Sequence, residues 1–161
     1  MMKRIIGSAC ILASASIIFT ATAQQEAPTP EQLAVSSTET RQAVFKLLSF
    51  NMGTISGMAR GTVEFDANIA ERNANRIAEL APMIPELFAA RDTRGFSVET
   101  EALPIIWDRM DEFNEKASNL VAAANTFAEI ARAGDKNATV AAVRAFGGAC
   151  GNCHDTFRED N

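Results

Sequence analysis

The sequence predicts an all-α protein, an antiparallel up-down-up-down four-helix bundle, and three observations lead to that prediction. Apolar residues recur at helical spacing in four successive segments, and no strand-like alternation competes with them. Tyrosine is absent, tryptophan occurs once and alanine is abundant, which favours helices over a β-sandwich. The chain has 161 residues, enough for one domain with its own core. A net charge of −5 gives no indication of nucleic-acid binding.

Residues 1–23 have the pattern of a cleaved signal peptide. Lys3 and Arg4 precede an apolar stretch over 5–19, and Ala21-Thr22-Ala23 fits an A-x-A cleavage site. A retained membrane anchor is the alternative, but the stretch is short for a span and serines interrupt it. We therefore expect cleavage, export to the bacterial periplasm, and no membrane contact of the mature protein.

Residues 24–36 are polar and contain Pro28 and Pro30, so a flexible N-terminal lead is expected before a bundle over 37–161. The first helix is predicted over about 37–59. Its buried face is expected to be one stripe at alternating spacings of four and three, made of Arg41, Phe45, Leu48, Met52, Ile55 and Ala59.

The second helix is predicted from about Asp66 to Leu80, where Pro82 and Pro85 end or break it. Its inward-facing residues are expected to be Ile69, Ile77 and Leu80. A loop with Asp92, Gly95 and Ser97 then separates the two halves of the chain.

The third helix has the clearest pattern, because its apolar residues keep a three-four alternation over about four heptads. Pro104 is expected in its first turn and Gly134 at its end. The stripe consists of Leu103, Ile106, Met110, Phe113, Ala117, Leu120, Ala124, Phe127 and Ala131. Asp135 begins the fourth helix, where Val140, Val143, Gly147, Cys150, His154 and Phe157 repeat the spacing.

The segment Cys150-Gly151-Asn152-Cys153-His154 is a C-x-x-C-H motif, the signature of covalent c-type haem attachment. The thiols of Cys150 and Cys153 can add to the two vinyl groups of one haem, and His154 can bind the iron axially. A structural zinc site would need about four ligands, and a thioredoxin-like pair would need a βαβ setting. We therefore predict one haem c, with a chance match as the remaining alternative.

His154 is the only histidine in the chain, so bis-histidine ligation within one subunit is excluded. The sixth position of the iron is then empty, or filled by a methionine, an amine or an external molecule. Met52 and the other methionines past the leader are expected to be core packing, which is their commonest role. No paired carboxylates or nucleophile indicate a dedicated enzyme. A haem peroxidase or NO reductase would also need a distal proton donor, and a gas sensor an output domain.

Three segments give the chain a resemblance to the cytochrome c′ family, the class II c-type cytochromes, over the whole length that follows the leader. Arg41-Gln42 resembles the Arg-Gln pair of that family's first helix, and Pro104-Ile105-Ile106-Trp107 resembles its Pro-x-Ile-Trp element. The run from Cys150 to Arg158 resembles the attachment segment, which lies near the C-terminus of the family's last helix. The resemblance implies a left-handed four-helix bundle with one haem.

The resemblance also implies roles for single residues. Phe45 matches the apolar position over the distal haem face, which implies a five-coordinate, high-spin iron. Arg158 is expected near the proximal pocket, or else as a plain charge at the helix end. Arg41 on an apolar stripe needs a partner if buried, and a haem propionate is a natural one, with Gln42 giving a second hydrogen bond. A solvated helix end is the alternative for Arg41.

The function implied is binding of diatomic gases such as NO and CO, electron transfer with an unidentified redox partner, or both. A low-spin electron carrier of the cytochrome c556 type, with methionine as sixth ligand, is the alternative. The family commonly dimerises through its first two helices. Gly53, Gly57 and Gly61, four residues apart, indicate close backbone approach, either in such a homodimer or within the chain.

Overall fold

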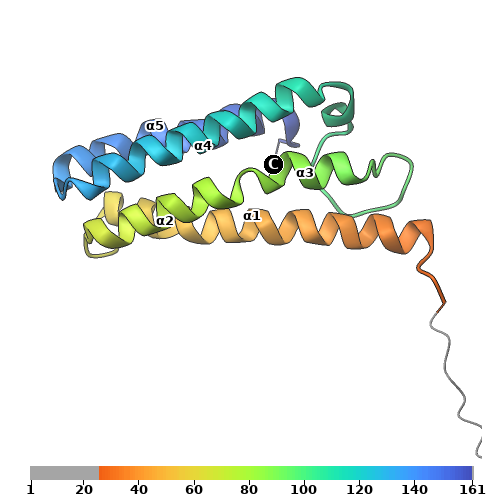
Figure 1. The fold of residues 1–161 in the computed structure, drawn as a ribbon, viewed down its shortest axis with the longest axis horizontal. Coiled ribbons are helices and arrows are strands. Elements are labelled where there is room, and N and C mark those ends of the chain that lie inside the picture. The colour runs from red at the N-terminus through yellow and green to blue at the C-terminus, as the bar shows by residue number, and fades with distance from the viewer. Residues whose placement is uncertain (1–25, 161) are drawn as a thin grey trace, which may run out of the picture.

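The computed structural model describes residues 26–160 as an antiparallel helical bundle, which confirms the predicted fold class (Figure 1). Four long helices form the bundle, and α3 continues from α2 along the same side (Figure 1). The elements are α1 (Pro30–Arg60), α2 (Ala67–Leu80), α3 (Met83–Ala90), the 3₁₀ segment η1 (Pro104–Asp108), α4 (Met110–Arg132) and α5 (Lys136–Phe157).

Helix α1 begins earlier than predicted, at Pro30, so the flexible lead expected over 24–36 is wrong for residues 30–36. Thr29 and Gln32 form a reciprocal capping box: the Gln32 amide donates to Thr29 Oγ1 at 3.2 Å and the Thr29 amide to Gln32 Oε1 at 2.8 Å. Pro30 occupies the first helical position, where its missing N–H costs nothing. The predicted signal peptide, 1–23, lies outside the described residues.

Two of the three spaced glycines are explained by the turn between α1 and α2. Gly61 ends α1 in the left-handed conformation, with φ of 72°. A Cβ on Gly57 would lie 2.6 Å from Cγ2 of Val63, so the turn folds directly over this glycine. The close approach at Gly57 is therefore to the chain's own turn and not to another helix.

The second and third predicted helices are confirmed with changes at their ends. Helix α2 stops at Leu80 before Pro82, whereas Pro85 lies in the first turn of α3, where proline is tolerated. Pro104 begins the 3₁₀ segment η1, and α4 begins only at Met110. The predicted α4 stripe is buried at Phe113, Ala117, Leu120, Ala124, Phe127 and Ala131.

Aromatic contacts join the elements at both ends of the core. Phe113 of α4 contacts Phe88 of α3 and Phe157 of α5, with ring centroids 4.9 and 5.3 Å apart. Phe127 and Phe146 stack at 5.0 Å toward the other end. Asp135 caps α5 as predicted, its carboxylate accepting from two backbone amides. The bundle thus holds α5 firmly where it carries the C-x-x-C-H motif.

Candidate functional site

The two thiols and the imidazole of the motif line one large cavity in the bundle. Cys150, Cys153 and His154 come from the last two turns of α5, are each half-buried, and neither thiol forms a disulfide. The cavity has a volume of about 1080 Å³. Its lining extends to α1, α2, α3, η1 and α4, so the motif faces the centre of the bundle.

The cavity has an apolar interior and a polar rim. The interior is formed by Ile77, Ile84, Phe88, Ile106, Phe113 and Leu120. Polar and charged side chains line the same space, among them Gln42, Lys46, Glu101, Lys116 and Arg158. A haem needs an apolar slot for its macrocycle and a polar edge for its propionates, so the donor set and the cavity fit one covalently attached haem. No three Cys, His, Asp or Glu side chains gather as metal ligands within residues 26–160, which argues against the zinc alternative.

Burial sets the ionisation of the three motif side chains. It raises the pKa of the Cys150 and Cys153 thiols, although the charge of Lys116 partly offsets this at Cys153. Burial also lowers the pKa of His154, and the nearby positive charge of Arg158 lowers it further. The neutral imidazole, the form that can ligate a metal, is therefore favoured at physiological pH.

The register of α1 against α5 sets which residue faces His154. A Cβ on Gly147 would lie 3.7 Å from the methyl carbon of Met52, so the two positions are level to within about the reach of the Met52 side chain. Because α1 and α5 are antiparallel, the N-terminal direction on α1 and the C-terminal direction on α5 lead to the same end of the bundle (Figure 1). Seven residues in these directions lead from Met52 to Phe45 and from Gly147 to His154, a rise of about 10 Å at 1.5 Å per residue.

Phe45 and Met52 both line the cavity, and their different levels separate their possible roles. Phe45 is 36% exposed, so the buried face predicted for the first helix is wrong at this residue. By the register above, it lies about level with His154. Met52 is half-buried against the core, two turns further along α1.

Arg41 is buried, but the partners that the structure gives it are not those expected. Its Nε and Nη2 groups each donate to the carbonyl of Leu87 at 3.2 Å, and Nη2 also donates to the carbonyl of Arg91. Nη1 donates to Thr93 Oγ1 at 3.1 Å. The partners of Arg41 in the structure therefore lie at the end of α3 and in the residues after it, and Arg41 also borders the cavity. Burial lowers the pKa of its guanidinium, which the charge of Asp92 partly offsets.

Gln42 and Arg158 lie at the polar edge of the cavity. The side-chain amide of Gln42 donates to the carbonyl of Glu99 at 2.8 Å, which ties α1 to the loop before η1. Arg158 follows α5 directly, and its Nε lies 3.8 Å from a carboxylate oxygen of Glu101. The amide of Glu159 donates to the carbonyl of Glu101 at 2.8 Å, so this loop is also fixed to the end of the chain.

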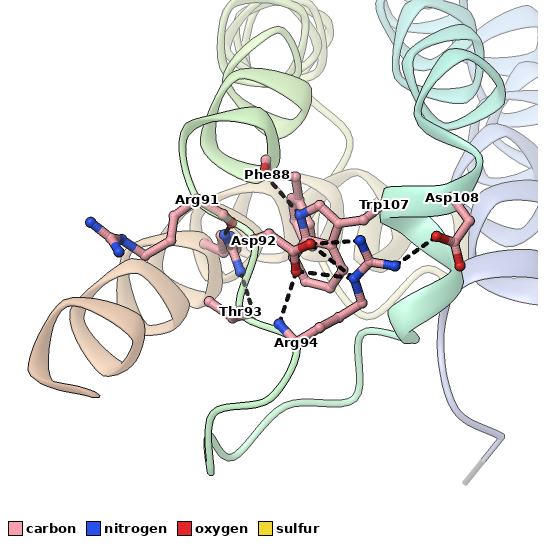
Figure 2. Close-up of polar contacts among 8 residues, drawn as sticks. Phe88, Arg91, Asp92, Thr93, Arg94, Trp107 and Asp108 are labelled. Atoms are coloured by element: carbon pink, nitrogen blue, oxygen red, sulfur yellow. Dashed lines mark hydrogen bonds and ion pairs between the residues drawn. The ribbon is translucent and has the colours of Figure 1, made fainter. Parts of the chain in front are cut away.

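A polar network at the end of α3 was not foreseen from the sequence. Figure 2 shows the Trp107 indole N–H donating to the carbonyl of Phe88, at 3.1 Å, and Arg94 reaching toward Asp92 and Asp108. Both oxygens of Asp92 and one of Asp108 accept from Arg94, at 2.6–3.2 Å. The short Asp92-x-Arg94 spacing was the one signal in the sequence, but its partner fourteen residues later was not predictable from it.

None of the helices in the described part of the chain is long and apolar enough to cross a membrane.

Comparisons with known proteins identify relatives across most of the chain. The family model described as "Cytochrome C'" matches residues 36–158. A cytochrome c-554 of Cereibacter sphaeroides is 35% identical over 122 residues, covering 75% of this chain and 79% of that protein. A crystal structure of cytochrome c′ from Rubrivivax gelatinosus aligns with a TM-score of 0.67 and 32% identity, covering 78% of this chain and 97% of that one.

A further similar structure is that of a cytochrome c′ described as having an unusual ligand-controlled dimer dissociation. It aligns with a TM-score of 0.66 and 30% identity, covering 79% of this chain and 97% of that one.

Proposed function

The chain belongs to the cytochrome c′ family and carries one covalently attached c-type haem, and on that premise we propose that it is a periplasmic protein whose haem iron is five-coordinate and binds small diatomic gases. The observation that supports the proposal is that Phe45 of α1 and His154 of α5 line the same cavity, with Met52, two turns from Phe45, reaching toward Gly147. A phenyl ring cannot ligate iron, whereas it can exclude water and bulky ligands.

Five groups are assigned to holding the haem. Cys150 and Cys153 supply the thioether bonds, and His154 supplies the axial nitrogen. Gln42 and Arg158 are assigned to the propionate edge and to the proximal side, because both border the cavity where its lining is polar. The bound haem supplies an iron that cycles between the ferric and ferrous states. What the protein adds is an apolar enclosure and one open axial direction.

Electron transfer is a second role that the same haem supports, with a redox partner still to be identified. The relatives found here carry the names of cytochromes and not of enzymes, which fits a carrier or gas-binding role. Low-spin carriers of the cytochrome c556 type place a methionine at the sixth position. Met52 is the cavity-lining methionine of α1, and its level, about two turns from His154, counts against that assignment.

The visible spectra of the ferric and ferrous protein test the proposal. We expect a high-spin ferric spectrum without a methionine–iron charge-transfer band, and a ferrous form that binds CO and NO. A low-spin ferric spectrum carrying that band would contradict five-coordination. Failure of the ferrous protein to bind either gas would contradict the gas-binding role.

Export to the periplasm rests on the leader pattern of residues 1–23. Expression of the full chain in a bacterium that matures c-type cytochromes tests this. We expect the haem-bearing protein in the periplasmic fraction, with a mass that corresponds to cleavage after Ala23. An intact N-terminus in the membrane fraction would favour a retained anchor.

A homodimer through the first two helices is also proposed, and exposed apolar residues of α1 support it. Phe50 is 68% and Leu47 is 50% exposed, and they lie three residues apart on one face of the helix. One similar cytochrome c′ is described by its dimer dissociation.

A further inference from the structure

Arg41 makes an unusual set of contacts for a charged side chain on a long helix. It is only 5% exposed, and its guanidinium donates to the carbonyls of Leu87 and Arg91 and to the hydroxyl of Thr93. The guanidinium carbon also lies 4.4 Å from the ring centre of Phe88. All these partners belong to α3 or to the residues that follow it. One side chain of α1 is thus bound to the end of another helix.

The end of α3 needs such partners. The last four carbonyl groups of a helix receive no hydrogen bond from within the helix and need donors from elsewhere. Arg91, the residue at its end, is extended, so no left-handed glycine closes the helix. Arg41 satisfies the carbonyl of Leu87, and the indole N–H of Trp107 satisfies the carbonyl of Phe88 at 3.1 Å. Side chains from α1 and η1 therefore cap α3 in place of a local motif.

The capped segment carries part of the cavity wall. Phe88 is 2% exposed and lines the cavity from α3. Phe45 lines it from α1, one turn after Arg41. The hydrogen bonds of Arg41 to Leu87 and Arg91 therefore join the two helices that carry these walls.

We propose that Arg41 is a positioning residue that holds the Phe45 and Phe88 walls of the cavity together, and that it does not bind a haem propionate. Its donors already point at three oxygen acceptors, and its planar face lies over Phe88 and, at 5.4 Å, over the ring of Trp107. These bonds use four of the five guanidinium N–H groups, so bidentate pairing with a propionate would take at least one buried acceptor's donor away, which is costly. Only the part of this inference that concerns CO access to the iron rests on the proposed gas-binding function.

The test uses the haem-loaded full chain and compares Arg41→Met, Thr93→Val and the double variant that carries both substitutions. The matched control is Arg91→Gln, because Arg91 offers its backbone carbonyl to Arg41 and that carbonyl survives the substitution. Three quantities are measured for each variant: the denaturation midpoint, the rate of CO binding to the ferrous protein, and the pH dependence of the reduction potential.

If Arg41 positions the walls, Arg41→Met and Thr93→Val both lower the denaturation midpoint and both speed CO binding several-fold. Their effects on stability are then non-additive in the double variant, because both remove the same hydrogen bond. The ionisation of the haem propionates, read from the pH dependence of the reduction potential, shifts no more in Arg41→Met than in Arg91→Gln.

Two results would overturn the proposal: a shift of that redox-linked ionisation in Arg41→Met beyond the control, or additive effects of the two substitutions on stability. If Arg41→Met does not fold, the proposal is overturned when Thr93→Val leaves both the midpoint and the CO rate unchanged. If the wild-type protein binds no CO, the gas-binding function fails, while the stability cycle and the reduction potential still decide the role of Arg41.

Discussion

The methyl carbon of Met52 on α1 lies 3.7 Å from the position that a Cβ on Gly147 of α5 would take. This contact brings the side chain of Met52 to the Gly147 level of α5, and both helices line one cavity. At 1.5 Å per residue, seven residues further along each helix bring Phe45 and His154 to about the same level, two turns from Met52. Which side chain of α1 can approach the iron opposite His154 follows from this register.

A methionine at position 45 is predicted to ligate the iron, whereas the native Met52 does not. We expect Phe45→Met to give a six-coordinate, low-spin ferric spectrum with a methionine–iron band, and to slow CO binding because the ligand must first be displaced. Phe45→Leu is the control of similar apolar character and should stay high-spin. Met52→Leu should leave the spectrum unchanged. A loss of low-spin character on changing Met52 would assign the sixth ligand to that residue.

A charge at the exposed apolar face of α1 is predicted to weaken dimerisation. Burying a phenylalanine side chain contributes about 1.5–3 kcal/mol, so Phe50→Glu should raise the dimer dissociation constant by about tenfold or more. Sedimentation velocity over a concentration series measures this. Val35→Glu, at a residue that is 41% exposed on the same helix, is the matched control and should remain dimeric. Equal behaviour of the two variants would place the dimer contact elsewhere.

Two glycine-to-alanine substitutions are predicted to change stability in opposite directions. Gly148→Ala should raise the free energy of unfolding by up to about 1 kcal/mol, because alanine is the better helix former and its Cβ meets no atom within 4 Å. Gly57→Ala should lower it, because the new Cβ would lie 2.6 Å from Val63 Cγ2. Thermal unfolding followed by circular dichroism measures both. Val63→Ala should rescue Gly57→Ala, and absence of rescue would show that the turn backbone is responsible.

The Asp92 carboxylate is predicted to make stability depend on pH in the acid range. Hydrogen bonds from Arg94 lower the pKa of Asp92 below its ordinary value of 3.8. Folding therefore favours the ionised form, so this contribution is complete above the ordinary value and is lost as the pH falls through the lower folded value. Asp92→Asn should destabilise the protein near neutral pH, and its difference from wild type should shrink under acid conditions.

Denaturation midpoints measured between neutral and acid pH test this prediction. The effect is expected to be small, because Asp92 and Arg94 are 43% and 41% exposed, and to decrease in high salt. A difference that grew as the pH fell would contradict the direction of the pKa shift.

Local patterns in the sequence were sufficient for the four long helices and for the attachment motif, but not for α3 or for the start of α1. The three-four spacing of Phe113, Ala117, Leu120 and Ala124 predicted a buried face that α4 has. The motif from Cys150 to His154 needs only neighbouring residues of one helix, so spacing alone identified it. The start of α1 was also local, since Thr29, Pro30 and Gln32 form a capping box, but the polar composition of residues 24–36 outweighed that signal.

What the sequence determined by itself is a helical bundle with a covalent haem site on its last helix, because helix periodicity and thioether chemistry depend on residues a few positions apart. Only the tertiary structure decided the partners of Arg41 and the cavity that Phe45 and His154 line together. Those relationships join residues about 46 to 109 positions apart. They depend on how far one helix slides and turns against another, which packing of the whole bundle sets and no local pattern encodes.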